Sequence, residues 1–186
     1  KLVDLKKLDD EFQLDIRYSS KNNFMRSKFY KNERAFFNMS AADRLIEAKN
    51  ELKKLGYGII IYDAYRPWFV TKMFWEGTPE NLKHFVANPE NGSSHNKGCA
   101  IDIGLYDIET GESIVMISGY DEFTERAYPN YMGGSKKQRD IRDMLIQVME
   151  RNDFTVYEYE WWHFNYNGCD SGIMNYSFEE LDSINS

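Results

Sequence analysis

The sequence contains few of the residues that carry metal, redox or membrane chemistry. Only 3 histidines and 2 cysteines occur among its 186 residues, so a histidine-based metal site has few candidate ligands. No apolar run approaches the roughly 20 residues of a membrane-spanning helix, which excludes such a span. Basic side chains are also scarce, 23 against 30 acidic ones, and the net charge of −7 argues against a surface for nucleic acid or anionic membrane.

The two cysteines, Cys99 and Cys169, do not indicate a cellular compartment, because a disulfide and two free thiols are both open. The chain begins at Lys1 and not at Met. We therefore expect either a trimmed cytoplasmic protein or an exported one whose signal peptide has been removed. The sequence does not indicate an oligomeric state.

Apolar and aromatic residues, in contrast, are plentiful. Hydrophobic residues make up 42% of the chain and aromatic residues 16%. This content excludes a disordered chain and predicts one domain, residues 1–186, with a substantial core. The many rings also favour a site with aromatic walls.

The hydrophobic pattern predicts strands and helices in irregular alternation. Strands are expected at 12–18, 58–64, 99–105, 113–117, 154–160 and 162–166. Helices are expected from Ser40 to Gly56, from Pro67 to about Trp75, over about 78–87, and from Ser135 onward. Two starts carry capping signals, Ser40 with Asp43 and Ser135 with Gln138. The order predicts an α+β fold with a central, mainly antiparallel sheet flanked by helices.

A loop that turns into a strand at residues 92–103 supplies the first candidate ligands. His95 lies in the loop, and the strand begins near Cys99. Alternation along the strand places Asp102 on a face with alanine and glycine neighbours, and Cys99 on the opposite, core-facing side. An imidazole and a carboxylate at one point make a plausible site for a borderline metal, but they require a third protein ligand.

The donor for that third position lies far downstream, at His163. Glu160 precedes it by three positions, so the two side chains converge only if the strand bulges at Trp161–Trp162. Glu158 is the competing acid at this end of the chain. Taken alone, a loop histidine such as His95 is more typical of a polar or structural residue, and His163 is equally compatible with packing under aromatic rings. His84, on a predicted helix, is expected to be solvated.

Arg66 follows a buried strand and directly precedes Pro67. Residues at strand ends are often site residues. The alternative is a surface arginine paired with Asp63.

These segments resemble the motifs of a known family, the D-alanyl-D-alanine dipeptidases, which are VanX-like enzymes of the LAS metallopeptidase group. The zinc motifs are matched by residues 93–102 and 160–163, and the arginine motif by residues 63–67. Tyr18, residues 23–24 and residues 121–126 match as well. The resemblance runs from about Leu2 to about Tyr166. It departs at Cys99, where a small polar residue is common, and gives no role to residues after Gly168.

The resemblance implies a hedgehog/D,D-peptidase-like zinc fold and a role for each matching residue. One Zn²⁺ would be held by His95, Asp102 and His163, with one position left open for water. Glu160 would be the general base, and Arg66 would bind the oxyanion. The substrate's amine would contact Asp121 and Tyr18, and its carboxylate would lie near Ser93 and Ser94.

The implied activity is zinc-dependent hydrolysis of D-alanyl-D-alanine to two D-alanines, in the metabolism of peptidoglycan precursors or fragments. Glycopeptide resistance and wall recycling both suit it. The alternative is a D,D-carboxypeptidase or endopeptidase acting on longer stem peptides. A third reading is a metal-dependent binding module without catalysis, but such a module needs neither Glu160 nor Arg66.

Overall fold

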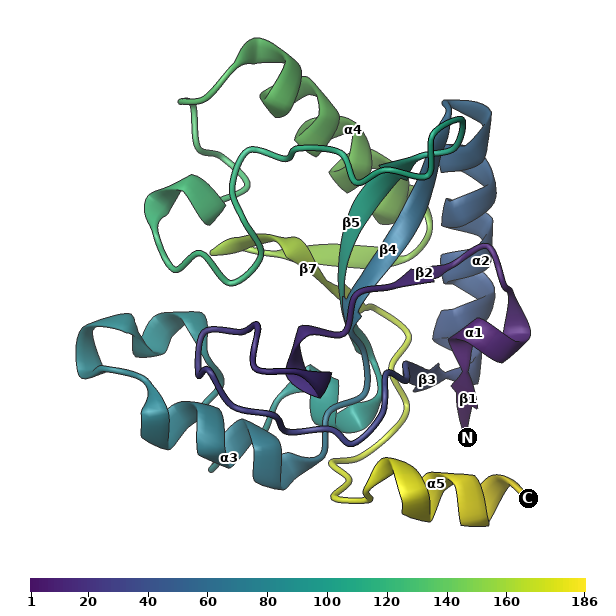
Figure 1. Ribbon diagram of the computed structural model, residues 1–186, viewed down its shortest axis with the longest axis vertical. Helices are drawn as coiled ribbons and strands as arrows, with labels where there is room; N and C mark the ends of the chain where they lie inside the picture. The colour runs from purple at the N-terminus through teal and green to yellow at the C-terminus, as the bar shows by residue number, and fades with distance from the viewer.

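The computed structural model describes residues 1–186, and a five-stranded sheet forms its centre (Figure 1). The strand order is β2, β4, β5, β7, β6. Their bounds are Gln13–Leu14, Tyr57–Asp63, Ala100–Asp107, Glu160–Tyr166 and Phe154–Tyr157. Only β2 and β4 run parallel, and the other neighbours are antiparallel. The predicted α+β fold with a mainly antiparallel sheet is confirmed.

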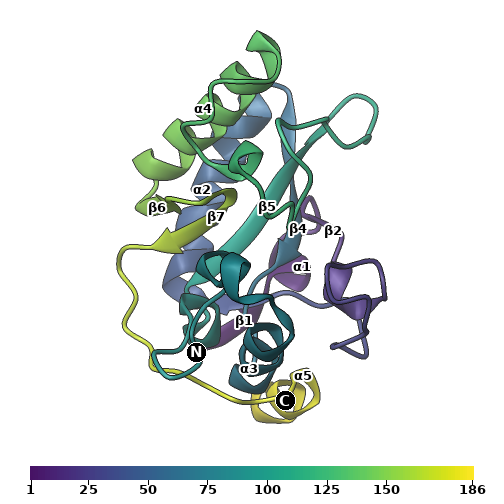
Figure 2. The ribbon, with the colours of Figure 1, turned by 90° about the vertical axis from the view of Figure 1, so that its left-hand side faces the viewer.

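Two long helices cover one face of this sheet and contact each other (Figure 2). They are α2, Met39–Lys54, and α4, Lys136–Arg151. Their apolar residues recur at helical spacing and are buried in the main core, for example Leu45 and Leu52 of α2 and Leu145 of α4. None of the helices in the protein has both the length and the apolar character required to cross a membrane.

The ends of these helices test the predicted capping signals. At α4, Ser135 and Gln138 form the expected capping box. At α2 the prediction of Ser40 with Asp43 is wrong, because the side chain of Asn38 accepts the N–H groups of Ser40 and Ala41. Gly56 follows α2 with φ +91°, the left-handed conformation expected after a helix end.

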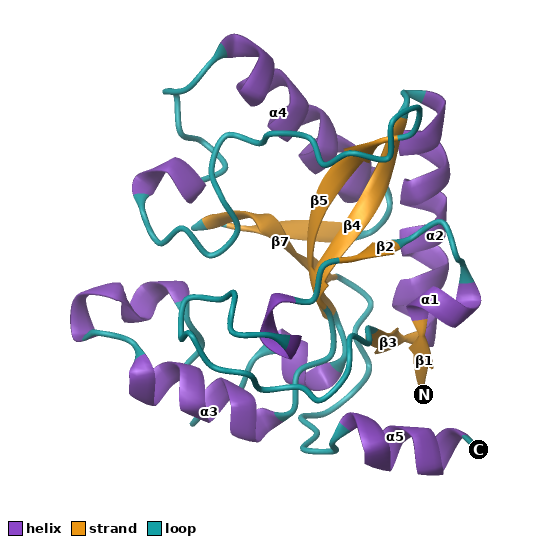
Figure 3. Ribbon diagram, viewed as in Figure 1, coloured by secondary structure: helices purple, strands orange, loops and turns teal.

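The remaining elements are short. They are β1, Leu2–Asp4; α1, Leu5–Leu8; β3, Phe36–Asn38; α3, Trp68–Gly77; α5, Phe178–Asn185; and 3₁₀ turns at Arg17–Ser19, Glu80–Phe85, Ser94–Lys97 and Glu125–Ala127. Strands β1 and β3 pair in a separate two-stranded sheet. Figure 3 shows that loops make up most of the region between the main sheet and α3.

Four predicted elements are shorter than the pattern indicated. The strand expected at 154–160 ends at Tyr157 in β6, and Glu160 already belongs to β7. The strand expected at 12–18 is confined to β2, because the N–H of Ile16 donates to the Glu33 carboxylate and the chain then turns. The helix expected at 78–87 is the 3₁₀ segment Glu80–Phe85. The strand expected at 113–117 is reduced to one bridge between Tyr106 and Ser113.

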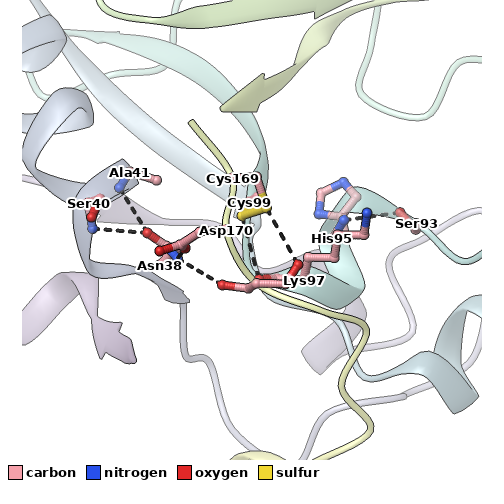
Figure 4. Close-up of a disulfide and its surroundings, with 10 residues drawn as sticks. Asn38, Ser40, Ala41, Ser93, His95, Lys97, Cys99, Cys169 and Asp170 are labelled. Atoms are coloured by element: carbon pink, nitrogen blue, oxygen red, sulfur yellow. Dashed lines mark hydrogen bonds between the residues drawn. A yellow bond between two sulfur atoms is a disulfide. The ribbon is translucent and has the colours of Figure 1, made fainter. Parts of the chain in front are cut away.

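A segment that we call the C-terminal arm, residues 169–177, follows β7 and leads to α5. A disulfide joins Cys99, at the start of β5, to Cys169, which settles the pairing that the sequence left open (Figure 4). The side-chain amide of Asn38 donates to Asp170 and Ser171. Farther along the arm, the N–H of Met174 donates to the carbonyl of Asn96, which directly follows His95, and the carbonyl of Met174 accepts the N–H of Trp68 at the start of α3.

Removing this disulfide is expected to lower the free energy of unfolding substantially. The cysteines are 70 residues apart, and chain entropy alone places the effect between about 3 and 4.7 kcal/mol for loops of about 15 to 100 residues. Urea unfolding of a metal-free Cys99→Ala, Cys169→Ala variant, followed by tryptophan fluorescence, measures it. Identical unfolding midpoints for the variant and the oxidised wild type would contradict this expectation.

Candidate active site

A pocket of about 200 Å³ opens among the loops at the end of the sheet. All nine residues singled out from the sequence line it: Tyr18, Arg66, Ser93, Ser94, His95, Asp102, Asp121, Glu160 and His163. Its volume is below the roughly 300–1,000 Å³ of pockets that accept drug-sized ligands, so it suits a small one. The fold therefore brings together residues that lie more than a hundred positions apart.

Three of these side chains converge on one point. The Nε2 atom of His95 lies 3.3 Å from Oδ1 of Asp102, and Nδ1 of His163 lies 3.2 Å from the same oxygen. One ligand atom from each residue falls within 4.8 Å of the other two. Two nitrogens and one oxygen at this spacing form a group that could hold a single divalent metal ion.

Hydrogen bonds behind the two imidazoles assign their tautomers. Nδ1 of His95 donates to the carbonyl of Ala64 at 2.7 Å, and Nε2 of His163 donates to Oδ1 of Asn165 at 2.8 Å. The unprotonated nitrogen of each ring therefore faces Asp102. This is the arrangement in which metal-binding histidines are usually held.

The polar atoms at the centre have no other partner. Nε2 of His95 and Oδ1 of Asp102 are buried and make no hydrogen bond, although almost all buried polar groups in proteins make one. The residues thus fit a metal ion that accepts nitrogen and oxygen ligands, as zinc does.

Strand pairing explains how two of the three candidate ligands meet. In the β5–β7 ladder Asp102 lies directly opposite His163. In the β6–β7 ladder Val156 pairs with Phe164 but Tyr157 pairs with Glu160, so residues 161–163 have no partners on β6. This irregularity is the bulge that the sequence required at Trp161–Trp162. It allows Glu160 and His163 to reach the same pocket.

Glu160 is the buried acid of the pocket, with 6% of its surface exposed. Burial raises its pKa well above the usual value, and the carboxylates of Asp102 and Asp121 raise it further. Positive charge nearby acts in the opposite direction, so a bound cation favours the carboxylate form. Glu158, the competing acid, is exposed and lies outside the pocket.

Arg66 is 8% exposed, so the alternative of a surface arginine is wrong, although its predicted partner is correct. Its Nε and a terminal nitrogen each lie 2.9 Å from Oδ2 of Asp63. The hydroxyl of Tyr30 donates to the other Asp63 oxygen at 3.0 Å. The guanidinium lies over the ring of Phe74, 4.7 Å from its centroid. These contacts fix a permanent positive charge at the pocket wall.

A second acid lies at another side of the pocket. The carboxylate of Asp121 accepts a hydrogen bond from the hydroxyl of Tyr18. Burial, reinforced by the charge of Asp102, raises the Asp121 pKa to about 7. Asp121 has φ +57°, a left-handed conformation that is uncommon for a residue other than glycine. Backbone strain of this kind is frequent at functional sites.

The two serines belong to the loop that carries His95. The hydroxyl of Ser93 accepts the N–H of His95 at 3.1 Å and caps the short 3₁₀ turn. Its own proton remains available to a ligand. Ser94 lines the pocket beside it.

Sequence reasoning missed two side chains that contact the candidate metal ligands. Tyr120 donates its hydroxyl proton to Oδ2 of Asp102 at 2.8 Å, and Asn165 accepts from His163. Asn165 could have been found, because it lies two positions after His163 on the same strand and so on the same face. The contact between Tyr120 and Asp102 depends on how a loop folds over the sheet, which no local pattern predicts.

The expected aromatic walls are present. Phe24, Phe74, Phe85 and Phe123 line the pocket. Their rings contact one another, with Phe24 about 5 Å from both Phe74 and Phe123, and Phe85 stacked on Phe123 at 5.0 Å. These rings form a connected apolar part of the pocket lining, and one of them, Phe74, also contacts the guanidinium of Arg66.

Comparison with known proteins places the chain in a family. A relative in Enterococcus faecium, a D-alanyl-D-alanine dipeptidase, is 32% identical over 171 residues, covering 81% of this chain and 83% of its own. The D-alanyl-D-alanine dipeptidase of Escherichia coli K12 is 29% identical over 163 residues, covering 88% and 83%. Among solved structures, the LD-carboxypeptidase LdcB aligns with a TM-score of 0.46 and 21% identity, over 73% of this chain and 61% of its own.

The family model for the M15 peptidases, described as D-Ala-D-Ala dipeptidase, matches residues 1–182. That match covers nearly the whole chain, including every residue of the pocket. The protein is therefore a metallopeptidase of the M15 D-alanyl-D-alanine dipeptidase family.

Proposed function

We propose that the protein is a zinc-dependent D,D-dipeptidase that hydrolyses D-alanyl-D-alanine to two D-alanines, in the metabolism of peptidoglycan precursors or fragments. The observation that carries the proposal is the buried group of His95, Asp102 and His163, whose central atoms have no hydrogen-bond partner. That group lies in a small pocket with an acid and an arginine on its walls.

Hydrolysis of an amide requires help at both reactants, because an amide carbonyl is a poor electrophile and neutral water a poor nucleophile. A zinc ion held by His95, Asp102 and His163 would supply Lewis acidity, which lowers the pKa of water and polarises a carbonyl. Glu160 would take the proton of the attacking water and deliver it to the leaving amine. Its buried position keeps bulk water from competing for that proton.

Arg66 would stabilise the negative charge that develops on the carbonyl oxygen. Its ion pair with Asp63 and its contact with Phe74 hold the guanidinium in place before substrate arrives. A charge that requires no reorganisation during the reaction is the most effective kind of electrostatic catalyst.

A free dipeptide carries one charge at each end, and the pocket offers a partner for each. The carboxylate of Asp121, oriented by Tyr18, would bind the ammonium group. The hydroxyls of Ser93 and Ser94 would bind the carboxylate. With the aromatic wall closing the small pocket, this pairing favours dipeptides over longer chains.

Blocking the substrate's amine is expected to lower kcat/KM by about 100-fold, because leaving a desolvated charge unpaired costs about 2–5 kcal/mol. Release of D-alanine from D-Ala-D-Ala and from its N-acetyl derivative measures the ratio. An Asp121→Asn variant is the control, and its ratio should approach one. Equal rates of the wild type on both substrates would favour the alternative, a carboxypeptidase or endopeptidase on longer stem peptides.

Metal analysis combined with a D-alanine release assay tests the proposal as a whole. The expected result is one zinc per chain and turnover of D-Ala-D-Ala. Stoichiometric zinc without hydrolysis of any D,D-peptide would instead support a binding module. A protein that binds no zinc would overturn the proposal.

A further inference from the structure

We propose that Tyr120 is a positioning residue for Asp102, which it holds in the orientation that a metal ion requires. The inference rests on the proposed zinc site and adds to it a side chain that touches neither metal nor substrate. It starts from the way in which the two oxygens of Asp102 are used.

The two Asp102 oxygens have different surroundings. Oδ1 faces both imidazoles, at 3.3 Å from His95 and 3.2 Å from His163, and makes no hydrogen bond. Oδ2 accepts the hydroxyl of Tyr120 at 2.8 Å, and the guanidinium of Arg66 is more distant, at 3.9 Å. Tyr120 is thus the hydrogen-bond donor that fixes the rotation of this carboxylate. With Oδ2 engaged, Oδ1 is the oxygen left for a cation.

Packing holds the Tyr120 ring in place. One face stacks on Tyr62, with centroids 4.5 Å apart and planes at 15°, and the edge meets Trp162 at 5.5 Å. Trp162 directly precedes the ligand His163 on β7. A hydroxyl on a ring held between two aromatic neighbours has little freedom to leave its partner.

The phenol protons of Tyr18 and Tyr120 are each committed to a different acid. The hydroxyls of Tyr120 and Tyr18 lie 3.2 Å apart. Each carries one proton, and Tyr18 gives its own to Asp121 while Tyr120 gives its own to Asp102. Tyr18 therefore has no proton to offer Asp102 without releasing Asp121. Loss of the Tyr120 hydroxyl would leave Oδ2 buried without a hydrogen bond, free to turn toward the cation or Arg66.

The test is zinc affinity in Tyr120→Phe, with Tyr62→Phe as the matched control. Both variants remove one hydroxyl and keep the stacked pair of rings, but the Tyr62 hydroxyl makes no hydrogen bond within the protein. Metal-free full-length proteins are titrated with zinc against a chromophoric chelator. We expect Tyr120→Phe to raise the zinc Kd about 10–100-fold, as loss of such an outer hydrogen bond typically does. Tyr62→Phe should match the wild type.

Cobalt provides a readout that a general loss of stability would not change. The visible absorption of the Co²⁺ form reports ligand geometry, and only Tyr120→Phe should shift it. If the wild type binds neither metal, the proposed function fails. If the wild type binds zinc but Tyr120→Phe has the same Kd and Co²⁺ spectrum, the role of Tyr120 is wrong. An equal loss of affinity in Tyr62→Phe would also overturn it, because that variant leaves the hydrogen bond from Tyr120 to Asp102 intact.

Discussion

Glu160→Gln should bind zinc as the wild type does and lose about 10²- to 10⁴-fold in kcat on D-Ala-D-Ala, the usual effect of removing a general acid–base group. Glutamine keeps the size of the side chain at this buried site but cannot accept the proton of water. The measurement is a D-alanine release assay at saturating substrate, with metal content determined on the same sample.

Glu158→Gln is the matched control, because Glu158 is the nearest acid along the chain and its side chain is exposed outside the pocket. It should retain full activity. Full activity in Glu160→Gln would refute the assignment of the base. Loss of zinc from Glu160→Gln would show that the residue acts on the metal site and not on the proton.

Arg66→Met is expected to lower kcat/KM by about 10²- to 10³-fold, the cost of losing an oxyanion donor. It should also lower the free energy of unfolding by about 3–5 kcal/mol, because Asp63 is then a buried charge without its partner. In the wild type, burial raises the pKa of Asp63 and the charge of Arg66 opposes that rise. Without Arg66, Asp63 keeps its proton in the folded protein at pH values where the unfolded chain has already released it. The loss of stability should therefore grow as pH rises above about 4, the pKa of an aspartate in an unfolded chain.

A double variant separates the two effects of Arg66. Asp63→Asn combined with Arg66→Met removes both charges, so most of the stability should return while the activity stays low. Urea unfolding at pH 5 and pH 8 and steady-state kinetics measure the two quantities. Activity within tenfold of the wild type in either variant would exclude the oxyanion role.

Local pattern predicted the parts of the site that lie on regular elements. Alternation along β5 placed Asp102 and Cys99 on opposite faces, and Asp102 does point into the pocket. The spacing from Glu160 to His163 required a bulge, and the β6–β7 ladder contains it. The capping box at Ser135 was correct because its two hydrogen bonds involve residues three positions apart.

The errors arose where distant contacts decide between local alternatives. Asn38 and Ser40 are both good capping residues, and sequence alone could not choose between them. Asn38 is also bound by the C-terminal arm through Asp170 and Ser171, more than 130 positions away. In the same way, β2 stops after two residues because Ile16 finds the carboxylate of Glu33. The roles of the nine pocket residues are predictions; the variants above test those of Glu160, Arg66 and Asp121, and metal analysis tests the group of His95, Asp102 and His163.

The bridge between Cys99 and Cys169 has a practical consequence for preparing the protein. Structural disulfides persist in oxidising surroundings, whereas a reducing bacterial cytosol keeps cysteines as thiols. A freed thiolate is itself a strong zinc ligand, and the two cysteines lie outside the pocket that holds His95, Asp102 and His163. Material produced under reducing conditions would therefore offer zinc sulfur donors at a second place in the chain, so the oxidation state should be checked before metal stoichiometry is interpreted.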